Sequence, residues 1–482
     1  MHLLTQTTRR LAQSWLLSAC ITILTLLSCK KENTPDPVST KKAITSFLLK
    51  YSSGAAIDSN SITVSITNDS ILIGLPSSVD ISNLIPEIEF TGISISPKSG
   101  LAQNFTQPVT YTVTAADGTT HTYVVKLSKN IINNLVFIGS SNNSFYALDA
   151  NTGSIKWQYN GTNGFSYSSP TYDSGVVYAG SIDNYLYAFD ALTGAIKWQF
   201  LTGGFGIESS PTVKDNIVYV GSNDDYLYAI NKVTGTLLWK YQTAQNVSST
   251  PLVYNGTVYV GSSDNYLYAL NAITGALQWK YATGALINQS SPALYNNNII
   301  IGSRDGYLHA VNATTGTLQW RFSTGGISLE MSNPTVANDI VYIGGWYNFN
   351  DFKQKGSLYA VNAATGTLVW HGLDTLGIGS DPCVTNNQVF VSSDDGNTYA
   401  INAATGNVLW QKTLYANGAG ATVSDGTVYI GGGGTGYFYA LDAVTGQQKW
   451  KTAIPNGIMT STPCVLGTAG TIHRGGEPSP AT

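Results

Sequence analysis

The sequence predicts an all-β protein in which a small β-sandwich precedes an eight-bladed β-propeller. Three observations favour this prediction: a tryptophan recurs at a nearly constant interval, glycine and tyrosine are abundant, and short alternating runs precede the repeats. Charged residues make up only 11% of the chain, which has 49 glycines and 29 tyrosines, as expected of aromatic strands joined by tight turns. With 482 residues, the chain exceeds the size at which one hydrophobic core usually stops growing, so at least two folding units are expected.

The N-terminus resembles an export signal. Two arginines precede an apolar run over residues 16–27 that is too short to span a bilayer. The run leads directly into Ser-Cys29 and resembles the cleavage box of bacterial lipoproteins, although Leu27 stands where a smaller residue is usual. We therefore expect a signal peptide over 1–28, lipidation at Cys29 and a polar tether over 29–42. This predicts a lipoprotein of the bacterial outer membrane that faces the periplasm or the cell surface; a secretory signal with an incidental cysteine is the alternative.

Charge and cysteine spacing argue against several classes of function. The formal net charge is −4 and no block of basic residues occurs, so nucleic acid is not an expected partner. Cys383 and Cys464 have no metal-ligand spacing and the five histidines are scattered, so no metal site is expected. The two cysteines occupy the same position in repeats that are not adjacent, which predicts buried thiols without a disulfide.

Residues 43–128 predict the sandwich. Runs of alternating apolar and polar residues at 62–66, 109–113 and 123–125 indicate strands with one buried face. Pro86, Pro97, Gly100 and the turn at 116–118 are expected to separate strands. About seven strands in fewer than ninety residues are the proportions of an immunoglobulin-like domain. The segment resembles a module that follows the anchor in many lipoproteins of Gram-negative bacteria, where it is a spacer or a glycan- or protein-binding module.

Residues 134–469 contain one unit of about forty residues, repeated eight times. The repeated tryptophans are Trp157, Trp198, Trp239, Trp279, Trp320, Trp370, Trp410 and Trp450. Each lies four residues after the glycine of a Thr-Gly pair and ten residues after an alanine. A repeat of this length with four strands per unit is typical of propeller blades. Residues 470–482 are expected to form a C-terminal tail.

The unit around Trp239 shows the expected blade. Strands are predicted over 209–213, 217–221 and 226–230, with Trp239 on the fourth, and Asp224-Asp225 suits the positive φ of a hairpin turn. The first unit lacks a first strand, whereas an extra strand at 461–465 follows the last tryptophan. We expect this strand to pair with the first unit and close the ring.

The recurring pattern A-x-[DN]-x-x-T-G-x-x-x-W, seen for example from Ala188 to Trp198, resembles the tryptophan-docking motif of the pyrroloquinoline quinone (PQQ) repeat family. In that family the tryptophan of one blade packs against the motif of the next, so the resemblance implies a structural role for all eight tryptophans. A lipidated propeller of this kind also resembles the BamB family of the outer-membrane barrel-assembly machinery. The immunoglobulin-like segment departs from the plain layout of that family.

The candidate binding residues lie on loops. Propeller topology places the loops between blades and the hairpins between second and third strands on one face, which ligands commonly use. The loops between blades supply Phe165, Tyr167, Phe205, Glu208, Gln289, Glu330 and Met331. One repeat is about ten residues longer and contributes Trp346, Tyr347, Phe349 and Phe352, whose aromatic rings suit a sugar or a partner protein. The alternative is that these rings pack on the adjacent blade.

The leading prediction is a non-catalytic, membrane-anchored binding or scaffold lipoprotein that recruits a protein or a glycan without a cofactor, as a monomer or in a membrane complex. The alternative is a PQQ-dependent oxidoreductase. Such enzymes resemble these repeats, and the resemblance implies adjacent cysteines, a calcium site and a catalytic aspartate. The chain has no Cys-Cys pair, and Glu208, Glu330 and Asp381 are too sparse to predict a calcium site. Stoichiometric PQQ binding with dye-linked alcohol oxidation would identify the enzyme.

Overall fold

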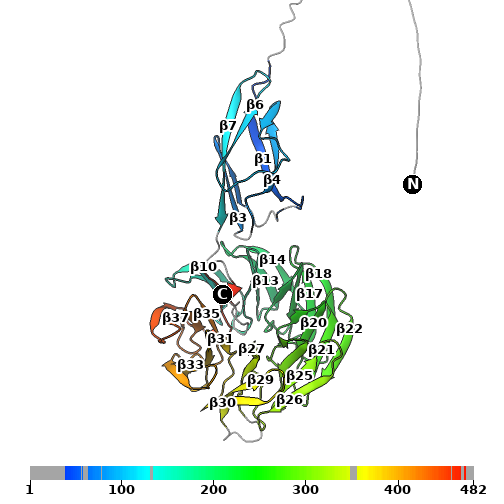
Figure 1. Ribbon diagram of the computed structural model, residues 1–482, viewed down its shortest axis with the longest axis vertical. Helices are drawn as coiled ribbons and strands as arrows, with labels where there is room; N and C mark the ends of the chain where they lie inside the picture. Colours follow the sequence, from blue (N-terminus) through cyan, green and yellow to red (C-terminus); the bar gives the residue numbers. More distant parts are fainter. Residues whose placement is uncertain are drawn as a thin grey trace, which may run out of the picture.

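The computed structural model describes residues 38–55, 57, 63–76, 79–130, 134–347, 355–457, 459–467 and 472–473. The predicted signal peptide, Cys29, Phe349, Phe352 and most of the predicted tail lie outside these residues. A β-sandwich is followed along the chain by a circular array of sheets (Figure 1). Within the described residues the regular structure consists of strands, and no helix there is long and apolar enough to cross a membrane.

The sandwich contains seven strands in two sheets. They are β1 (Ala43–Tyr51), β2 (Thr63–Ile66), β3 (Ser70–Pro76), β4 (Leu84–Thr91), β5 (Ser94–Ser96), β6 (Val109–Thr114) and β7 (Thr120–Asn130). One sheet is β1-β4 and the other has the order β2-β3-β7-β6-β5, in which only β3 and β7 run parallel. The core contains Phe47, which meets Phe105 and Tyr111 edge to face at centroid distances of 6.5 and 5.5 Å.

The burial predicted from the alternating pattern agrees with the structure in two of the three runs. Tyr111 and Val125 are fully buried within the runs at 109–113 and 123–125. In the run at 62–66, the burial of residues 64–66 is described and all three are exposed, because β2 is the outermost strand of its sheet; Val64, for example, is 43% exposed. Pro86 does not separate strands as expected; it lies inside β4, opposite Leu49. Since β4 pairs with a single strand in its sheet, a residue without an N–H is tolerated there.

The propeller has eight antiparallel sheets. Blade one is built from β8 (Leu135–Gly139), β9 (Ser144–Asp149), β10 (Ile155–Asn160) and β39 (Cys464–Leu466), with β40 (Ile472–His473) beyond β39. Blades two and three are β11 (Thr171–Asp173), β12 (Val176–Gly180), β13 (Tyr185–Asp190) and β14 (Ile196–Leu201), then β15 (Thr212–Lys214), β16 (Ile217–Gly221), β17 (Tyr226–Asn231) and β18 (Leu237–Gln242). Blades four and five are β19 (Leu252–Tyr254), β20 (Thr257–Gly261), β21 (Tyr266–Asn271) and β22 (Leu277–Ala282), then β23 (Ala293–Tyr295), β24 (Asn298–Gly302), β25 (Tyr307–Asn312) and β26 (Leu318–Ser323). Blade six is β27 (Thr335–Ala337), β28 (Ile340–Gly344), β29 (Gly356–Asn362) and β30 (Leu368–Thr375). Blades seven and eight are β31 (Cys383–Thr385), β32 (Gln388–Ser392), β33 (Asn397–Asn402) and β34 (Val408–Thr413), then β35 (Ala421–Ser424), β36 (Thr427–Gly431), β37 (Tyr437–Asp442) and β38 (Gln448–Ala453).

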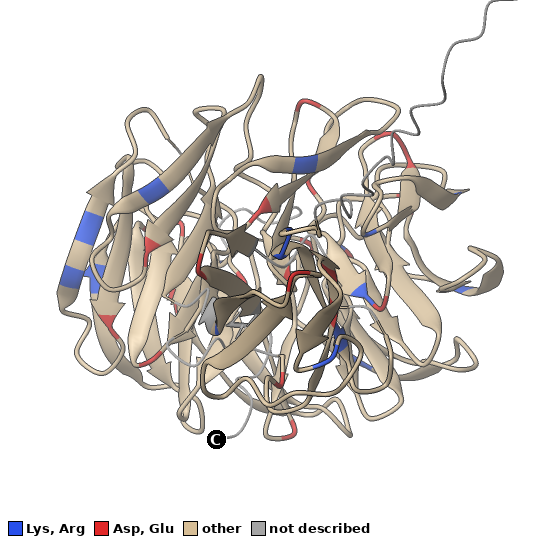
Figure 2. Cartoon of the chain, turned by 90° about the horizontal axis from the view of Figure 1, so that it is seen from above, with Lys and Arg blue, Asp and Glu red and all other residues tan. Residues whose placement is uncertain are grey.

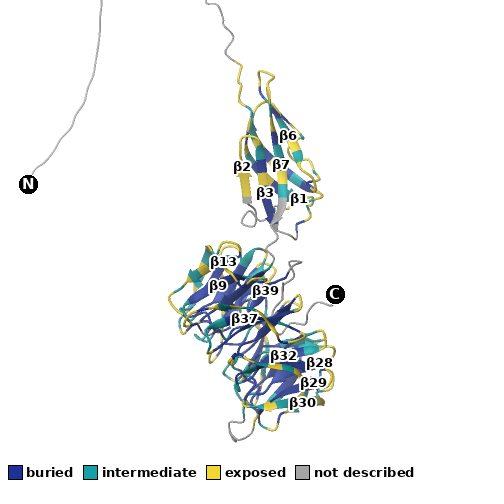
Figure 3. Ribbon diagram, turned by 90° about the vertical axis from the view of Figure 1, so that its left-hand side faces the viewer, coloured by how far each residue is buried: buried dark blue, intermediate teal, exposed yellow. Residues whose placement is uncertain are grey.

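Burial changes across each blade in the same way. The second and third strands are buried on both faces because a neighbouring blade stacks on each side, as β16 and most of β17 show. The fourth strand alternates between exposed and half-buried residues, so the exposed positions gather on the outside of the ring (Figure 3). At the predicted hairpin turns, Asp225, Asn265 and Gly306 have φ values of 72°, 74° and 79°.

The ring closes by pairing of the two ends of the propeller. On β39, Cys464 and Leu466 lie opposite Phe137 and Leu135 of β8, which confirms the predicted closing strand. Closure gives each blade of the ring a neighbouring blade on both sides, so no blade face is left open to another chain. Cys383 and Cys464 are both buried and form no disulfide, as predicted.

Each repeated tryptophan lies at the interface with the next blade. The indole Nε1 of Trp279 donates a hydrogen bond of 3.0 Å to the carbonyl of Ala313, and the same bond recurs at all eight interfaces with lengths of 2.9–3.1 Å. The last of them joins Trp450 to Ala150, so it links blade eight to blade one. The indole of each tryptophan lies against the glycine of the Thr-Gly pair in the neighbouring blade. A Cβ on Gly316, for example, would be 2.7 Å from the indole of Trp279. The tryptophans therefore join the blades into a ring.

Candidate binding face

Backbone hydrogen bonds place the loops between blades beside the hairpins that join second and third strands. We call the loops from a fourth strand to the next first strand the connecting loops. In blades two to eight a hairpin amide donates to a connecting-loop carbonyl, for example Ile182 to Gly164, Asn223 to Gly206 and Asp394 to Gly377. The two kinds of loop therefore form one face, which carries most of the predicted binding residues.

The centre of this face leads into a channel ringed by polar residues. The residue before the proline of each first strand lies on the ring: Ser169, Ser210, Thr250, Ser291, Asn333, Asp381 and Thr462. The amide of one such residue donates to the side chain of the next, for example Thr250 to Ser291 at 2.9 Å and Asn333 to Asp381 at 2.9 Å. These residues and the adjoining first strands line a cavity of about 360 Å³.

Blade eight interrupts the ring. Gly420 stands at the corresponding position, and a Cβ on it would lie 1.9 Å from Oγ1 of Thr462. The Thr462 side chain therefore occupies the space that a Gly420 side chain would need. Its hydroxyl donates to the carboxylate of Asp381, which also accepts hydrogen bonds from the backbone and side chain of Asn333.

Asp381 is the one carboxyl group among the residues described as lining this cavity. Burial raises its pKa to about 6, although the hydrogen bonds from Asn333 and Thr462 act in the opposite direction. Because the folded-state pKa lies above the value of an unfolded aspartate, the folded chain binds this proton more tightly. The group therefore stabilises the fold below about pH 4, and that contribution is lost as the pH rises through 6.

We expect Asp381→Asn to remove this pH dependence. A shift of about two pKa units corresponds to about 3 kcal/mol, so the variant should gain up to that amount relative to wild type between pH 4 and pH 8. Urea unfolding of both chains at the two pH values measures the gain. An identical difference in unfolding free energy at pH 4 and pH 8 would show that the carboxyl does not titrate in this range.

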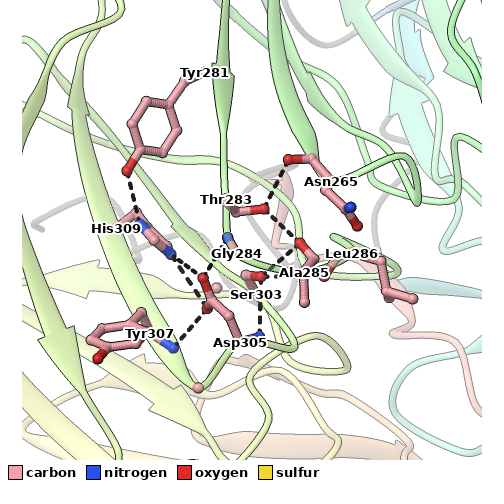
Figure 4. A network of polar contacts seen from close by, with 12 residues as sticks. Asn265, Tyr281, Thr283, Gly284, Ala285, Leu286, Ser303, Asp305, Tyr307 and His309 are labelled. Carbon is pink, nitrogen blue, oxygen red and sulfur yellow. Dashed lines mark hydrogen bonds and ion pairs between the residues drawn. The ribbon is translucent and has the colours of Figure 1, made fainter.

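The hairpins are fastened to the blades by a recurring tyrosine-aspartate bond. Tyr228 and Tyr268, for example, donate to Asp224 and Asp264 at 2.6 Å. Blade five has His309 at the tyrosine position, with Nε2 3.1 Å from Oδ2 of Asp305. Figure 4 shows this variant, in which the hydroxyl of Tyr281 also contacts His309.

The charge of Asp305 is well compensated within this network. Burial acts to raise its pKa, but the hydrogen bond and charge of His309 and the amides of Gly284 and Tyr307 outweigh burial and lower the pKa. The imidazole is buried and the carboxylate is only 12% exposed, so this bond is part of the scaffold of the face.

The insertion in blade six begins with an anchored aromatic pair. The indole Nε1 of Trp346 donates to Oδ2 of Asp394 in blade seven at 2.6 Å, and the Tyr347 ring lies 4.0 Å from the Trp346 ring. Gly377 leaves room for the indole, since a Cβ there would be 2.6 Å from it. Trp346 thus packs on the adjacent blade, as the alternative interpretation of the insertion proposed. Phe349 and Phe352 lie outside the described residues.

Two predicted residues of the connecting loops are buried and not exposed. Phe165 is 1% exposed because its backbone and Cβ fill the space beside Gly139, where Ile207 and Val247 fill the corresponding spaces in the next two blades. Glu330 is 3% exposed; its Oε1 lies 3.7 Å from Nε of Arg304, and its Oε2 has no hydrogen-bond partner. Burial raises the pKa of Glu330, and the charge of Arg304 and a hydrogen bond from the side chain of Ser328 oppose this rise.

The remaining predicted residues lie at the surface. Tyr167 is 50% exposed, Phe205 is 83% exposed and Glu208 is half-buried. The sequence prediction missed Tyr415, which is 58% exposed on the connecting loop between blades seven and eight. The sequence feature that could have identified Tyr415 is its place in a connecting loop equivalent to the loop that carries Phe205.

Basic residues are concentrated away from this face. Within the described part of the propeller most of them lie on the fourth strands, where Lys240 and Lys280 lie over the rings of Tyr226 and Tyr266 at 4.2 and 4.1 Å. Figure 2 shows the blue bands on the outer strands and the red ones mainly at strand ends and turns. In the described part of the chain, no three His, Cys, Asp or Glu side chains are grouped so that they could hold a metal ion.

Eight blades joined by docked tryptophans define a β-propeller of the PQQ-repeat class, here preceded by an immunoglobulin-like sandwich. The family described as "Outer membrane protein assembly factor BamB" matches residues 131–206, 201–355, 304–414 and 354–469, which is more than half of the chain. The chain therefore belongs to this family. The family described as "SGBP, N-terminal" matches residues 44–127.

Solved structures show the same propeller fold. BamB from Moraxella catarrhalis is 22% identical, with a TM-score of 0.53 over 62% of this chain and 89% of that one. The computationally designed protein Ika8 is 18% identical, with a TM-score of 0.50 over 64% of this chain and 96% of that one. A sequence search of curated proteins gives no match.

Proposed function

We propose that this protein is a non-catalytic lipoprotein of the outer membrane that binds a partner protein through the face of connecting loops. Membership of a family described as an outer-membrane assembly factor supports this role. The lipoprotein-like sequence ahead of Cys29 supports the anchor, and the sandwich between anchor and propeller would hold the face away from the membrane.

The observation that best supports this proposal is the backbone conformation of two exposed aromatic residues. Phe205 and Tyr415 have φ values of 64° and 51°, in the left-handed region that bulky residues avoid at a cost of about 1–2 kcal/mol. Each presents more than half of its side chain to solvent. An aromatic ring that stays exposed on such a backbone contributes little buried area to the fold, whereas such rings are common anchors in protein interfaces.

The spacing of these rings favours a protein over a glycan. Phe205 lies between blades two and three, and Tyr415 between blades seven and eight, so the two anchors are separated by the channel mouth. A partner that contacts both must cover much of the face, as a protein does. A glycan bound at one loop would depend on one ring only.

The proposal includes no quinone cofactor. Asp381, the carboxylate of the channel, is bonded to Asn333 and Thr462, and the described residues include no group of three potential metal ligands. Stoichiometric binding of PQQ in the presence of calcium would overturn this part of the proposal.

We expect Phe205→Asn and Tyr415→Asn to weaken partner binding at least tenfold without loss of stability. Asparagine tolerates a positive φ, so each change removes the ring and relieves the backbone. Affinity capture from cross-linked outer membranes, compared with a glycan array, measures the binding. Leu192→Asn is the control, because Leu192 is 53% exposed on a hairpin between third and fourth strands, at the opposite end of the blade. Capture that survives both substitutions, or glycan binding that requires one ring only, would contradict the proposal.

A further inference from the structure

The channel cavity is rich in hydrogen-bond acceptors and poor in donors. The amides of six residues of the polar ring are already used, because each donates to the side chain of the next ring residue. Ser169, for example, donates to Ser210 at 2.8 Å. Six prolines in the lining have no N–H to offer: Pro170, Pro211, Pro251, Pro292, Pro334 and Pro463. A bound molecule would therefore meet mainly carbonyl, carboxylate and hydroxyl oxygens, together with apolar carbon.

Further acceptors lie on the side of blades four to six. In blades two, three, six and eight a first-strand threonine donates to the proline carbonyl of the next blade, as Thr212 does at 2.5 Å. Leu252 and Ala293 stand at the corresponding positions of blades four and five and have no hydroxyl. The carbonyls of Pro292 and Pro334 therefore lack the side-chain donor that the equivalent carbonyls of other blades have.

The cavity has one apolar side and one charged group. We call the residues of the apolar side the apolar wall: Leu252, Ala293, Leu294 and Val336. Asp381 lines the same cavity and is only half-buried. Its carboxylate can accept about four hydrogen bonds and is recorded with three, two from Asn333 and one from Thr462. With a pKa of about 6 it is ionised at neutral pH, and the described lining contains no Lys, Arg or His to balance its charge.

We propose that the channel cavity binds an ammonium group carried on an apolar stem. The ammonium would donate to Asp381 and to neighbouring oxygens, and the stem would lie against the apolar wall. A volume of about 360 Å³ is sufficient for a small ligand of this kind. Two sources offer the same chemistry, a free alkylamine and a lysine side chain inserted from the open face. This inference goes beyond the proposed function, which depends on the exposed rings of Phe205 and Tyr415 and not on this cavity.

Other ligands fit these observations less well. An anion would meet Asp381 and the acceptors of the polar ring, with no cation in the described lining to bind it. A sugar would leave the charge of Asp381 unbalanced and place some of its hydroxyls against the apolar wall. A divalent cation requires more oxygen ligands, and the described residues contain no group of three acidic, histidine or cysteine side chains.

The test is calorimetric titration of the full mature chain at neutral pH with pentylamine and with pentanol, which is similar in size but uncharged. We expect pentylamine to bind about tenfold more tightly or better, because its hydrogen bond to Asp381 is charge-assisted. Asp381→Asn should abolish this preference and Asp215→Asn should retain it. Asp215 is a suitable control because it is exposed on the turn between β15 and β16 and has φ of 54°, which asparagine tolerates.

The source of the ammonium group is distinguished by a parallel titration. Acetyl-Gly-Lys-Gly-amide is compared with the same peptide carrying uncharged norleucine in place of lysine. A preference for the lysine peptide that requires Asp381 would identify an inserted side chain as a ligand. A preference confined to pentylamine would identify a free amine.

Ala293→Thr tests the apolar wall without a change of charge. Threonine stands at this position in blades two, three and six, so the variant should fold. Its hydroxyl would donate to the carbonyl of Pro334, and its larger side chain would narrow the cavity. We expect pentylamine to bind about threefold more weakly or worse to this variant.

Equal affinity for pentylamine and pentanol, together with equal affinity for the two peptides, overturns the inference. A preference for the charged ligands that survives Asp381→Asn also overturns it. If Asp381→Asn does not fold, the comparisons on the wild-type chain and on Ala293→Thr still decide. Displacement of pentylamine by an equal concentration of potassium chloride would show a site for any monovalent cation, which contradicts the role of the stem. Partner capture that depends on Phe205 and Tyr415 is measured separately, so the two proposals fail separately.

Discussion

Replacement of Trp279 by alanine is expected to lower the free energy of unfolding by about 3–5 kcal/mol, the range for removal of a large aromatic side chain from a packed site. The indole donates to the carbonyl of Ala313 at 3.0 Å, and its ring lies 5.7 Å from the ring of Tyr259 in the same blade. Alanine would leave a void between blades four and five and remove one of the bonds that join them. Urea unfolding followed by circular dichroism measures the loss.

Trp279→Phe separates packing from hydrogen bonding in the same site. Phenylalanine retains an aromatic ring but has no donor for Ala313, so we expect a smaller loss of about 1–2 kcal/mol. Tyr259 also donates to the carbonyl of Ala313 at 3.0 Å, and this second bond limits the loss. A change below 1 kcal/mol for Trp279→Ala would mean that the interface does not depend on the docked indole.

Features of the fold that depend on repeated local patterns could be predicted from the sequence. The constant distance from a Thr-Gly pair to a tryptophan indicates a turn and a strand, and eight copies leave a ring as the arrangement that buries every blade on both faces. The closing strand was predictable for the same reason, because the first unit lacks a strand and the last has one in excess. Hairpin residues such as Asp225 were predictable from the few residue types that tolerate positive φ.

The candidate site was less predictable, since the burial of a loop residue depends on contacts far away in the sequence. Glu208 and Glu330 hold equivalent positions, yet Glu330 is buried beside Arg304 of the blade-five hairpin, and its charge acts on Tyr347 of blade six. Phe165 was expected at the surface because it lies in a loop. An apolar residue recurs at that loop position in other blades, and this recurrence was the available sign of its burial.

Gly316→Ala is expected to lower the free energy of unfolding by about 3–4 kcal/mol, much more than the usual effect of one added methyl group. Gly316 has φ of 69°, and its Cβ would be 2.7 Å from Cδ2 of Trp279, a contact that neither the backbone nor the packed ring can readily relieve. Gly256→Ala is the matched control, because Gly256 has φ of 73° but nothing within 4 Å of its Cβ position. The control should lose only the conformational part, about 1–2 kcal/mol.

The effects of Gly316→Ala and Trp279→Ala on stability are expected to be coupled. If Gly316→Ala destabilises the fold through contact with the indole, it should do so by only about 1–2 kcal/mol when Trp279 is already alanine, as Gly256→Ala does in wild type. Unfolding free energies of the two single variants and the double variant give this coupling directly. If the two changes in unfolding free energy simply add, the effect of Gly316→Ala comes from the backbone alone. The glycine in all eight Thr-Gly turns would then be required for its positive φ and not for contact with the tryptophan.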